Sequence, residues 1–480
     1  MNLTQANAAQ AVLGVRENIK YFFRQPENIN MMNNYFISKD IFHNREIYRR
    51  ACDKWSITEK QIIRLRQRQA DFAAANITQR TSALSAFAER LSINAEKIAY
   101  AICEEVGRCL PECRAEVEKS ISLIRYYTHL APELLARKTV ATGASLSQIA
   151  FEPLGLVFAI MPWNYPVWQI LRFAVPALCA GNACLVKPAP TVGRVSEMLF
   201  ELVGDDLPFQ AAFLSHNDIE CAIQNTDAMA FTGSANTGRH LAQIAGKYLK
   251  KCVLELGGSN AFIVLQDADI QAAARDACHS RFRDAGQSCN AAKRIILVPE
   301  IADDFMAEFL QHCEKLQSGN PMLPETTLAC LHLDNAAQQM QDFVDNAVSC
   351  GAILRMGEGL PETPHAYPAT VLDCVPLNAK VANEEVFGTV AAVFRADNVE
   401  HAIQIANHSP FGLGACIYSA DTNAAWELGK RLNVGSVFIN RHTSSDLRLP
   451  FGGVKSSGFG RELSEFGLYE FVNVKSYWQK

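Results

Sequence analysis

Three residues of this 480-residue chain have the side chains and settings that a reaction through a covalent intermediate would use. Cys289 ends the polar segment Gly-Gln-Ser-Cys, where a thiol is placed to act as a nucleophile rather than to fill a core. Glu255 ends an apolar run, and burial of a carboxylate there would tune its pKa as a general base requires. Asn164 lies between prolines in Met-Pro-Trp-Asn-Tyr-Pro, where a fixed amide can donate to an oxyanion. Taken singly, each also has a structural interpretation: a buried thiol, a salt-bridged carboxylate and a turn asparagine.

Several common catalytic and nucleotide-binding motifs are absent. The chain has no GxGxxG after a predicted strand and no GxxxxGK[ST], so neither the usual dinucleotide fingerprint nor a P-loop is present. It also lacks HExxH and GxSxG. Cys109 and Cys113 have CxxxC spacing without a second pair, so we expect no metal site.

The composition is that of a globular protein, with 49% hydrophobic and 20% charged residues. The formal net charge of −5 gives no reason to expect binding to nucleic acid or to an anionic membrane. The 15 cysteines are odd in number and spread over the whole length, which favours a reducing compartment over a disulfide scaffold. No basic, apolar leader and no run of 18 apolar residues occurs. We therefore expect a cytoplasmic protein without a membrane span.

The elements that must position these residues are helices first and alternating strands and helices later. Residues 62–135 show helical periodicity, and residues 139–152 read as extended strands or a hairpin. Short apolar runs then alternate with helical segments, which predicts βαβ units and a mostly parallel sheet. The alternation begins again after Gly258 and indicates a second such domain, from about 257 to 440, before a final strand over 471–478. Ligands bind beyond the carboxyl ends of such strands, where Asn164, Lys187, Ser234 and Glu255 follow or end apolar runs.

Together the motifs resemble those of the aldehyde dehydrogenase superfamily, over about residues 60–480. They are MPWNYP, VKPAP, FTGSANTG, LELGGSNAF, GQSCNAAKR, EEVFG, NHSPFGLG and PFGGVKSSGFGRE, in this order. The resemblance implies that Cys289 attacks an aldehyde and that Asn164 and the Cys289 N–H hold the oxyanion. The resulting thiohemiacetal passes a hydride to a nicotinamide, and Glu255 activates the water that hydrolyses the thioester.

The resemblance also implies a domain organisation. The fold class is α/β, with two parallel-sheet domains and a small oligomerisation arm. The cofactor-binding domain would comprise residues 1–135 and 152–256, of which 1–55 form an atypical N-terminal segment. Residues 257–440 would form the catalytic domain. Residues 136–151 and 463–480 would form oligomerisation elements that extend a neighbour's sheet in a homodimer or homotetramer.

By the same resemblance, a set of residues would bind the cofactor, NADP or NAD. Trp163 and Lys187 would lie along the ribose, Gly233 and Ser234 would meet the pyrophosphate at a helix N-terminus, and Glu385 and Phe387 would contact the nicotinamide end. The full predicted set is Trp163, Asn164, Lys187, Pro190, Gly233, Ser234, Leu256, Glu385 and Phe387.

Two departures from the family pattern concern this cofactor. NAD-preferring relatives often carry a glutamate where this chain has Pro190. Since a carboxylate there would repel a 2′-phosphate, its absence predicts that NADP is accepted, alongside NAD. The stretch from Lys187 to Ser234 is also several residues shorter than in typical relatives, around 207–216.

Two arginines indicate the substrate class. Arg172 follows Asn164 by eight residues and Arg283 precedes Cys289 by six, and the planar guanidinium group suits a carboxylate. The pair is similar to the arginines that hold the distal carboxylate in succinate-semialdehyde dehydrogenases, and Ser445 would add a hydrogen bond. We expect an aldehyde with a distal carboxylate, succinate semialdehyde. The alternatives are a broad-range or other semialdehyde dehydrogenase, a CoA-acylating enzyme, which Glu255 disfavours, and a non-catalytic relative that kept the fold.

Overall fold

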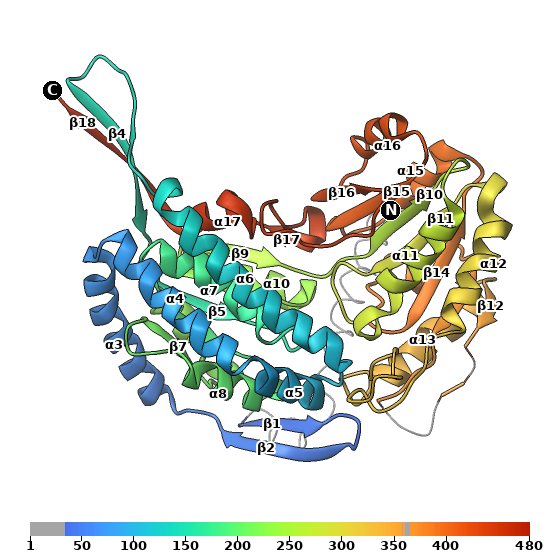
Figure 1. Ribbon diagram of the computed structural model, residues 1–480, viewed down its shortest axis with the longest axis horizontal. Coiled ribbons are helices and arrows are strands. Elements are labelled where there is room, and N and C mark those ends of the chain that lie inside the picture. Colours follow the sequence, from blue (N-terminus) through green and yellow to red (C-terminus); the bar gives the residue numbers. More distant parts are fainter. Residues whose placement is uncertain (1–33, 358, 361–364) are drawn as a thin grey trace, which may run out of the picture.

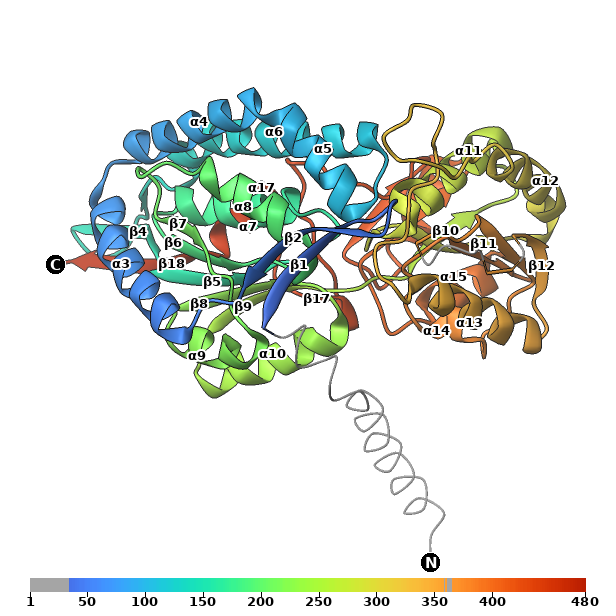
Figure 2. The ribbon, with the colours of Figure 1, turned by 90° about the horizontal axis from the view of Figure 1, so that it is seen from below.

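The computed structural model describes residues 34–357, 359–360 and 365–480 (Figure 1). Residues 1–33, the larger part of the predicted N-terminal segment, lie outside the described residues. Two α/β units lie side by side, and a narrow arm of strands extends from the first unit away from the second (Figures 1 and 2). The α/β class and the two mostly parallel sheets confirm the fold expected from the alternation of strands and helices.

The first unit is built on a six-stranded sheet with the order β17-β9-β8-β5-β6-β7. All neighbouring strands are parallel except β17 and β9, which pair antiparallel. Its strands are β5 (Leu156–Ile160), β6 (Ala183–Lys187), β7 (Phe209–Ala211), β8 (Ala228–Thr232), β9 (Lys251–Glu255) and β17 (Gly458–Phe459). In register, Lys187 pairs with Ile160 and Glu255 with Thr232, so the strands end together at one edge.

Helices cover both faces of this sheet. Alternate residues of β5 pack into two different cores: Val157 and Ala159 face one helical layer, and Leu156 and Phe158 the other. The first layer contains α4 (Ile77–Ile93), α5 (Ala95–Val106), α6 (Leu110–Leu134), α7 (Trp168–Cys179), α8 (Gly193–Glu201) and α17 (Ser464–Tyr469). The second contains α3 (Trp55–Ala74), α9 (Ile219–Gln224) and α10 (Ala235–Lys247). Burial on both faces explains why these strands read as continuous apolar runs.

The second unit has a seven-stranded sheet with the order β12-β13-β14-β11-β10-β15-β16, in which only β12 is antiparallel to its neighbour. Its strands are β10 (Asn260–Val264), β11 (Ala292–Leu297), β12 (Ile353–Met356), β13 (Thr370–Asp373), β14 (Val390–Arg395), β15 (Gly414–Tyr418) and β16 (Ser436–Ile439). Its helices are α11 (Ile270–Phe282), α12 (Ala302–Cys313), α13 (Ala336–Ser349), α14 (Lys380–Asn383), α15 (Val399–Asn407) and α16 (Thr422–Gly429).

Short 3₁₀ turns occur in both units. They are η1 (Pro190–Val192), η2 (His216–Asp218), η3 (Arg283–Gly286), η4 (Pro299–Ile301) and η5 (Lys455–Ser457).

The arm is a three-stranded antiparallel sheet. Strand β18 (Val472–Gln479) pairs along its whole length with β4 (Leu146–Pro153), and β3 (Lys138–Thr139) pairs with the other edge of β4. The buried Asn182 ties the root of the arm to the first unit, because its amide donates to the Phe471 carbonyl and accepts from the N–H of Leu154. The strands and the hairpin predicted for these segments are therefore present.

A further hairpin, β1 (Tyr35–Asp40) and β2 (Arg45–Ala51), lies in the part of the N-terminal segment that the structure describes. Its Ser38 hydroxyl accepts from the N–H of Gly193 at the start of α8. Between residue 34 and the C-terminus, outside the gaps given above, no helix has the length and apolar character needed to cross a membrane.

Candidate active site

The three residues with catalytic side chains meet where the first sheet faces the second unit. Glu255 is the last residue of β9, Asn164 follows β5, and Cys289 lies in the loop between η3 and β11. Gly258 lets the end of β9 approach this loop closely, since a Cβ built there would lie 2.6 Å from the Cys289 carbonyl oxygen. The topology thus brings together a thiol, a carboxyl group and an amide that are far apart in sequence.

The loop that carries Cys289 is held in an unusual backbone conformation. Asp284, Ala285 and Gly286 have φ values of 55°, 53° and 68°, in the left-handed region. A Cβ on Gly286 would overlap the Arg281 side chain and the Gly388 carbonyl, so only glycine fits. Left-handed backbone costs energy for non-glycine residues, and surrounding contacts must therefore hold Asp284 and Ala285 in place.

Those contacts centre on a buried ionic network. The Arg108 guanidinium group, 1% exposed, pairs with Glu116 and, through Nε at 2.5 Å, with Asp284 Oδ1. The other Asp284 oxygen accepts from the Tyr165 hydroxyl at 2.5 Å and from Arg283 Nε at 2.9 Å. Although burial raises the pKa of Asp284, Arg108 and Arg283 hold it at about 2, so this carboxylate stays ionised.

Asn164 is fixed against the nucleophile loop. Its side-chain Nδ2 donates to the Gln287 carbonyl at 3.0 Å, two residues before Cys289. Gln287 is itself held, because its side chain donates to Cys330 O and accepts from the N–H of His332. No described residue accepts from the backbone N–H of Cys289. This N–H and the remaining N–H of the Asn164 amide are donors suited to an oxyanion.

Glu255 is buried close to other charged side chains. It is 2% exposed, and burial together with the neighbouring Glu462 raises its pKa well above the usual range, while Arg172 opposes that shift. Arg172 and Glu462 form a buried ion pair through Nε and Oε2. Burial thus favours the neutral form of this carboxyl group, which must be ionised to act as a base.

The Cys289 thiol is uncharged at neutral pH. Burial raises its pKa to about 11, against the lowering effect of Arg172 and Lys293. A neutral thiol is a poor nucleophile, so this site needs proton removal when the reaction begins. Glu255 and Glu385 both raise the pKa of Cys289, and Glu255 is the one of the two that is predicted to serve as a base.

The predicted cofactor residues border the same strand ends. Trp163 meets Phe387 edge-on at 5.7 Å between ring centroids and stacks on His332 at 4.2 Å. Lys187, the last residue of β6, is 2% exposed, and burial lowers its pKa to about 8. Pro190 begins η1, which is separated from Lys187 by two residues.

At the start of α10 the structure modifies the prediction for Gly233. Its N–H is donated to the Glu255 carbonyl and is not available to a phosphate. Ser234 is the N-cap and accepts from the N–H of Thr237, so the N–H groups of residues 234–236 are the ones left for an anion. Leu256 packs against Gly238 of this helix, where a Cβ would lie 2.5 Å from a Leu256 methyl group.

Glu385 is anchored by a buried lysine. One of its carboxylate oxygens accepts from Lys293 Nζ at 2.5 Å and from the N–H of Gly258 at 3.0 Å. Lys293 Nζ also donates to the Gly258 carbonyl and lies 5.3 Å from the Phe387 ring centroid. The lysine thus connects the residue predicted to hold the nicotinamide ribose with the end of β9 that carries the base.

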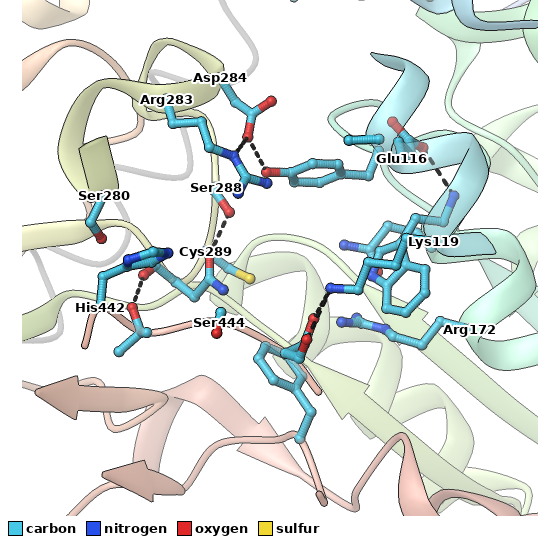
Figure 3. A pocket seen from close by; sticks show the side chains of 18 of the residues that line it. Glu116, Lys119, Arg172, Ser280, Arg283, Asp284, Ser288, Cys289, His442 and Ser444 are labelled. Carbon is cyan, nitrogen blue, oxygen red and sulfur yellow. Dashed lines mark hydrogen bonds and ion pairs between the residues drawn. The ribbon is translucent and has the colours of Figure 1, made fainter. Parts of the chain in front are cut away.

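A pocket opens beside Cys289, and the three predicted substrate residues Arg172, Arg283 and Ser445 all line it (Figure 3). The remaining charged lining residues are Arg108, Glu116, Lys119 and Asp284. Cationic side chains therefore outnumber carboxylates around the opening that leads to the thiol. This charge distribution suits an anionic ligand.

Comparison with known proteins agrees with this geometry. The model of the aldehyde dehydrogenase family matches residues 48–477. The chain belongs to the aldehyde dehydrogenase family. This confirms the resemblance drawn from the motif set.

The similar curated proteins include two bacterial enzymes. A protein of Mycobacterium leprae named succinate-semialdehyde dehydrogenase [NADP(+)] is 38% identical over 88% of this chain and 94% of its own length. The Escherichia coli succinate semialdehyde dehydrogenase [NAD(P)+] Sad is 38% identical over 85% of this chain and 90% of its own length. Among solved structures, succinic semialdehyde dehydrogenase from Streptococcus pyogenes in complex with NADP+ is 29% identical, with a TM-score of 0.89 over 92% of this chain and 99% of that one.

Reasoning from the sequence missed several charged residues of this aldehyde dehydrogenase site, namely Arg108, Glu116 and Asp284 of the buried network and three others. Lys119 of α6 reaches the pocket from the first unit, Lys293 holds Glu385, and Glu462 pairs with Arg172. Lys293 and Glu462 stand inside or next to recognised motifs, so a search for charges there could have found them. Lys119 had no such signal, because its hydrogen bond joins residues 326 positions apart.

The raised pKa of Cys289 predicts a steep pH dependence of its alkylation in the ligand-free aldehyde dehydrogenase. The thiolate fraction grows about tenfold per pH unit below the pKa, so the iodoacetamide rate at Cys289 should rise about 100-fold from pH 7 to pH 9. Mass spectrometry of the Cys289 peptide measures this rate apart from the exposed Cys221 and Cys374. A rate that is flat over this range would mean that the thiol is already ionised.

The buried network predicts that Arg108→Met destabilises the fold. It leaves Glu116 and Asp284 buried without their cation, and such a loss costs about 3–5 kcal/mol. Thermal unfolding followed by circular dichroism should show a markedly lower midpoint. Arg114→Met on α6 is the control, because the ion pair of Arg114 with Glu96 is exposed and should contribute little. Equal midpoints for the two variants would contradict a structural role for Arg108.

Proposed function

We propose that this aldehyde dehydrogenase oxidises succinate semialdehyde to succinate and accepts NADP, with NAD also used. The observation that carries the proposal is the cationic pocket beside Cys289, lined by Arg172, Arg283 and Ser445. An aldehyde whose far end is a carboxylate would place that end among these groups while its carbonyl faces the thiol. The names of the curated relatives support the same substrate and cofactors.

Three side chains would carry the proposed reaction. The Cys289 sulfur adds to the aldehyde carbon after its proton has left, and the Asn164 amide and the Cys289 N–H stabilise the oxyanion. A nicotinamide dinucleotide, held by the residues predicted to bind it, would supply the hydride acceptor for that carbon. Glu255, once ionised, takes a proton from the water that attacks the thioester, and hydrolysis releases the acid and restores the thiol.

The cofactor fits residues of this chain. The free N–H groups at the start of the 13-residue helix α10 suit a pyrophosphate, and the side chain of Ser234 is exposed there. Glu385, held by Lys293, has carboxylate oxygens suited to ribose hydroxyls. Trp163 and Phe387 present aromatic surfaces on the two sides of the junction between the units.

The arm supports a proposal about assembly. Its strand β18 exposes Val474 and Trp478, which are 58% and 69% accessible. A second copy of the chain would cover such apolar residues, so we propose a homodimer or homotetramer in which residues 136–151 and 463–480 meet a neighbour.

The proposed substrate predicts a clear preference in an initial-rate assay. With saturating NADP, kcat/KM for succinate semialdehyde should exceed that for uncharged butanal by about 10–100-fold, the range expected for charge-assisted hydrogen bonds. Cys289→Ala should lower kcat by about three orders of magnitude or more. Equal kcat/KM values would refute the carboxylate pocket, and absence of oxidation with either cofactor would refute the enzymatic activity.

Pro190 predicts how the cofactor preference can be changed. Pro190→Glu introduces a carboxylate next to the expected adenosine ribose, which would repel a 2′-phosphate and could accept from ribose hydroxyls. We expect kcat/KM for NADP relative to NAD to fall by about tenfold, or ~1.4 kcal/mol. Pro190→Gln is the neutral control. A ratio unchanged by both substitutions would place the 2′-phosphate elsewhere.

A further inference from the structure

The four cationic side chains that line the pocket beside Cys289 differ in their partners. Arg108 is paired with Glu116 and Asp284, Arg283 shares Asp284, and Arg172 is paired with Glu462. Lys119 is the exception: no carboxylate of the described residues lies within ion-pair distance of its Nζ. Arg172 and Arg283, the two cations predicted from the sequence, are thus already paired with carboxylates. Lys119, which the sequence analysis did not predict, has no such pair among the described residues.

Neutral groups hold the Lys119 ammonium group at the pocket. Its Nζ donates to the Ser445 carbonyl at 3.1 Å and to the Ser445 hydroxyl at 2.5 Å, and it lies 4.5 Å from the Trp168 ring centroid. Burial, and then the charges of Arg172 and Arg283, lower the pKa of Lys119 to about 8, against a raising effect of Asp446, which lies beyond ion-pair distance. Figure 3 shows Lys119 and Arg172 reaching in from one side of the pocket, opposite the loop that carries Cys289. A partly buried cation that neighbouring cations repel gains most from an incoming anion.

Arg172, in contrast to Lys119, already interacts with carboxyl groups. It contacts Glu462, and its charge lowers the pKa of Glu255 while that of Glu462 raises it. A substrate carboxylate placed on Arg172 would bring a second anion next to Glu462 and compete for the same guanidinium group. The charge of Arg172 therefore acts on Glu462, Glu255 and Cys289.

We propose that Lys119, together with the Ser445 hydroxyl that it positions, forms the main ion pair with the distal carboxylate of the aldehyde and sets the preference for anionic substrates. This inference rests on the proposed function and deepens it. It assigns Lys119 to substrate affinity, and Arg172 mainly to the chemistry at Cys289 and Glu255.

Steady-state kinetics with two aldehydes of equal chain length separate these roles. Lys119→Met should raise KM for succinate semialdehyde about tenfold or more and leave kcat/KM for butanal within about twofold, whereas Lys119→Arg should restore most of the affinity. Arg172→Met should lower kcat for both aldehydes. Lys97→Met, an exposed lysine on α5, is the control and should change neither.

Protection of Cys289 from iodoacetamide by succinate is a readout independent of turnover. Succinate should protect the wild-type enzyme and Lys119→Arg, and protection should be lost or need about tenfold more succinate in Lys119→Met. The proposal is overturned if Lys119→Met changes neither KM nor protection, or if it impairs both aldehydes equally. A third outcome separates the two proposals. If succinate protects the wild-type enzyme through Lys119 but both aldehydes are oxidised equally well, the proposed substrate preference is refuted and the anion site at Lys119 is retained.

Discussion

The buried guanidinium group of Arg108 is the constraint on which the active site of this aldehyde dehydrogenase depends. It pairs with Glu116 on α6 and with Asp284 in the nucleophile loop, and it stacks over the Tyr165 ring at 4.2 Å. Asp284 in turn holds left-handed backbone five residues before Cys289, a conformation that a free loop would leave. Desolvating these charges is costly, so the network holds only if every partner is present. The position of Cys289 therefore depends on the same network that contacts Tyr165, the residue next to Asn164.

The same network extends to the general base through a chain of contacts. The oxygen of Glu116 that Arg108 does not engage accepts from the N–H groups of Val167 and Trp168, at 2.9 Å each, and so fixes the start of α7. That helix carries Arg172, whose partner Glu462 shares the surroundings of Glu255. The oxyanion donor, the nucleophile and the base are thus linked through buried charges to one helix. A change at Arg108, Glu116 or Glu462 would therefore alter the surroundings of Glu255, the proposed base, without altering a predicted substrate residue.

The sequence was a good guide where the signal is local and a poor one where the contact is distant. Continuous apolar runs predicted the parallel strands, because strands buried on both faces need no polar alternation. Cys289, Glu255 and Asn164 were singled out from the few residues around each, and the structure places them near the same strand ends; their catalytic roles stay a prediction. Lys119 could not be singled out in this way. The pattern of an amphipathic helix indicates which residues face away from the core, but it does not indicate which distant loop they contact. The availability of an N–H also escapes the sequence, as Gly233 shows by donating to Glu255.

The division of charge in the pocket has a consequence for catalysis. Burial raises the pKa of both the proposed base and the nucleophile, so the surrounding charges govern when they ionise. If the substrate carboxylate were bound by Arg172, its negative charge would offset the cation that favours ionisation of Glu255 and Cys289. Binding would then oppose the deprotonation that the chemistry requires. A separate cation without a carboxylate of the described residues in ion-pair distance removes this conflict, because Lys119 would neutralise the substrate charge while Arg172 continues to act on Glu462 and Glu255. Recognition of an anionic aldehyde and activation of a thiol in the same pocket therefore call for two cations with separate partners.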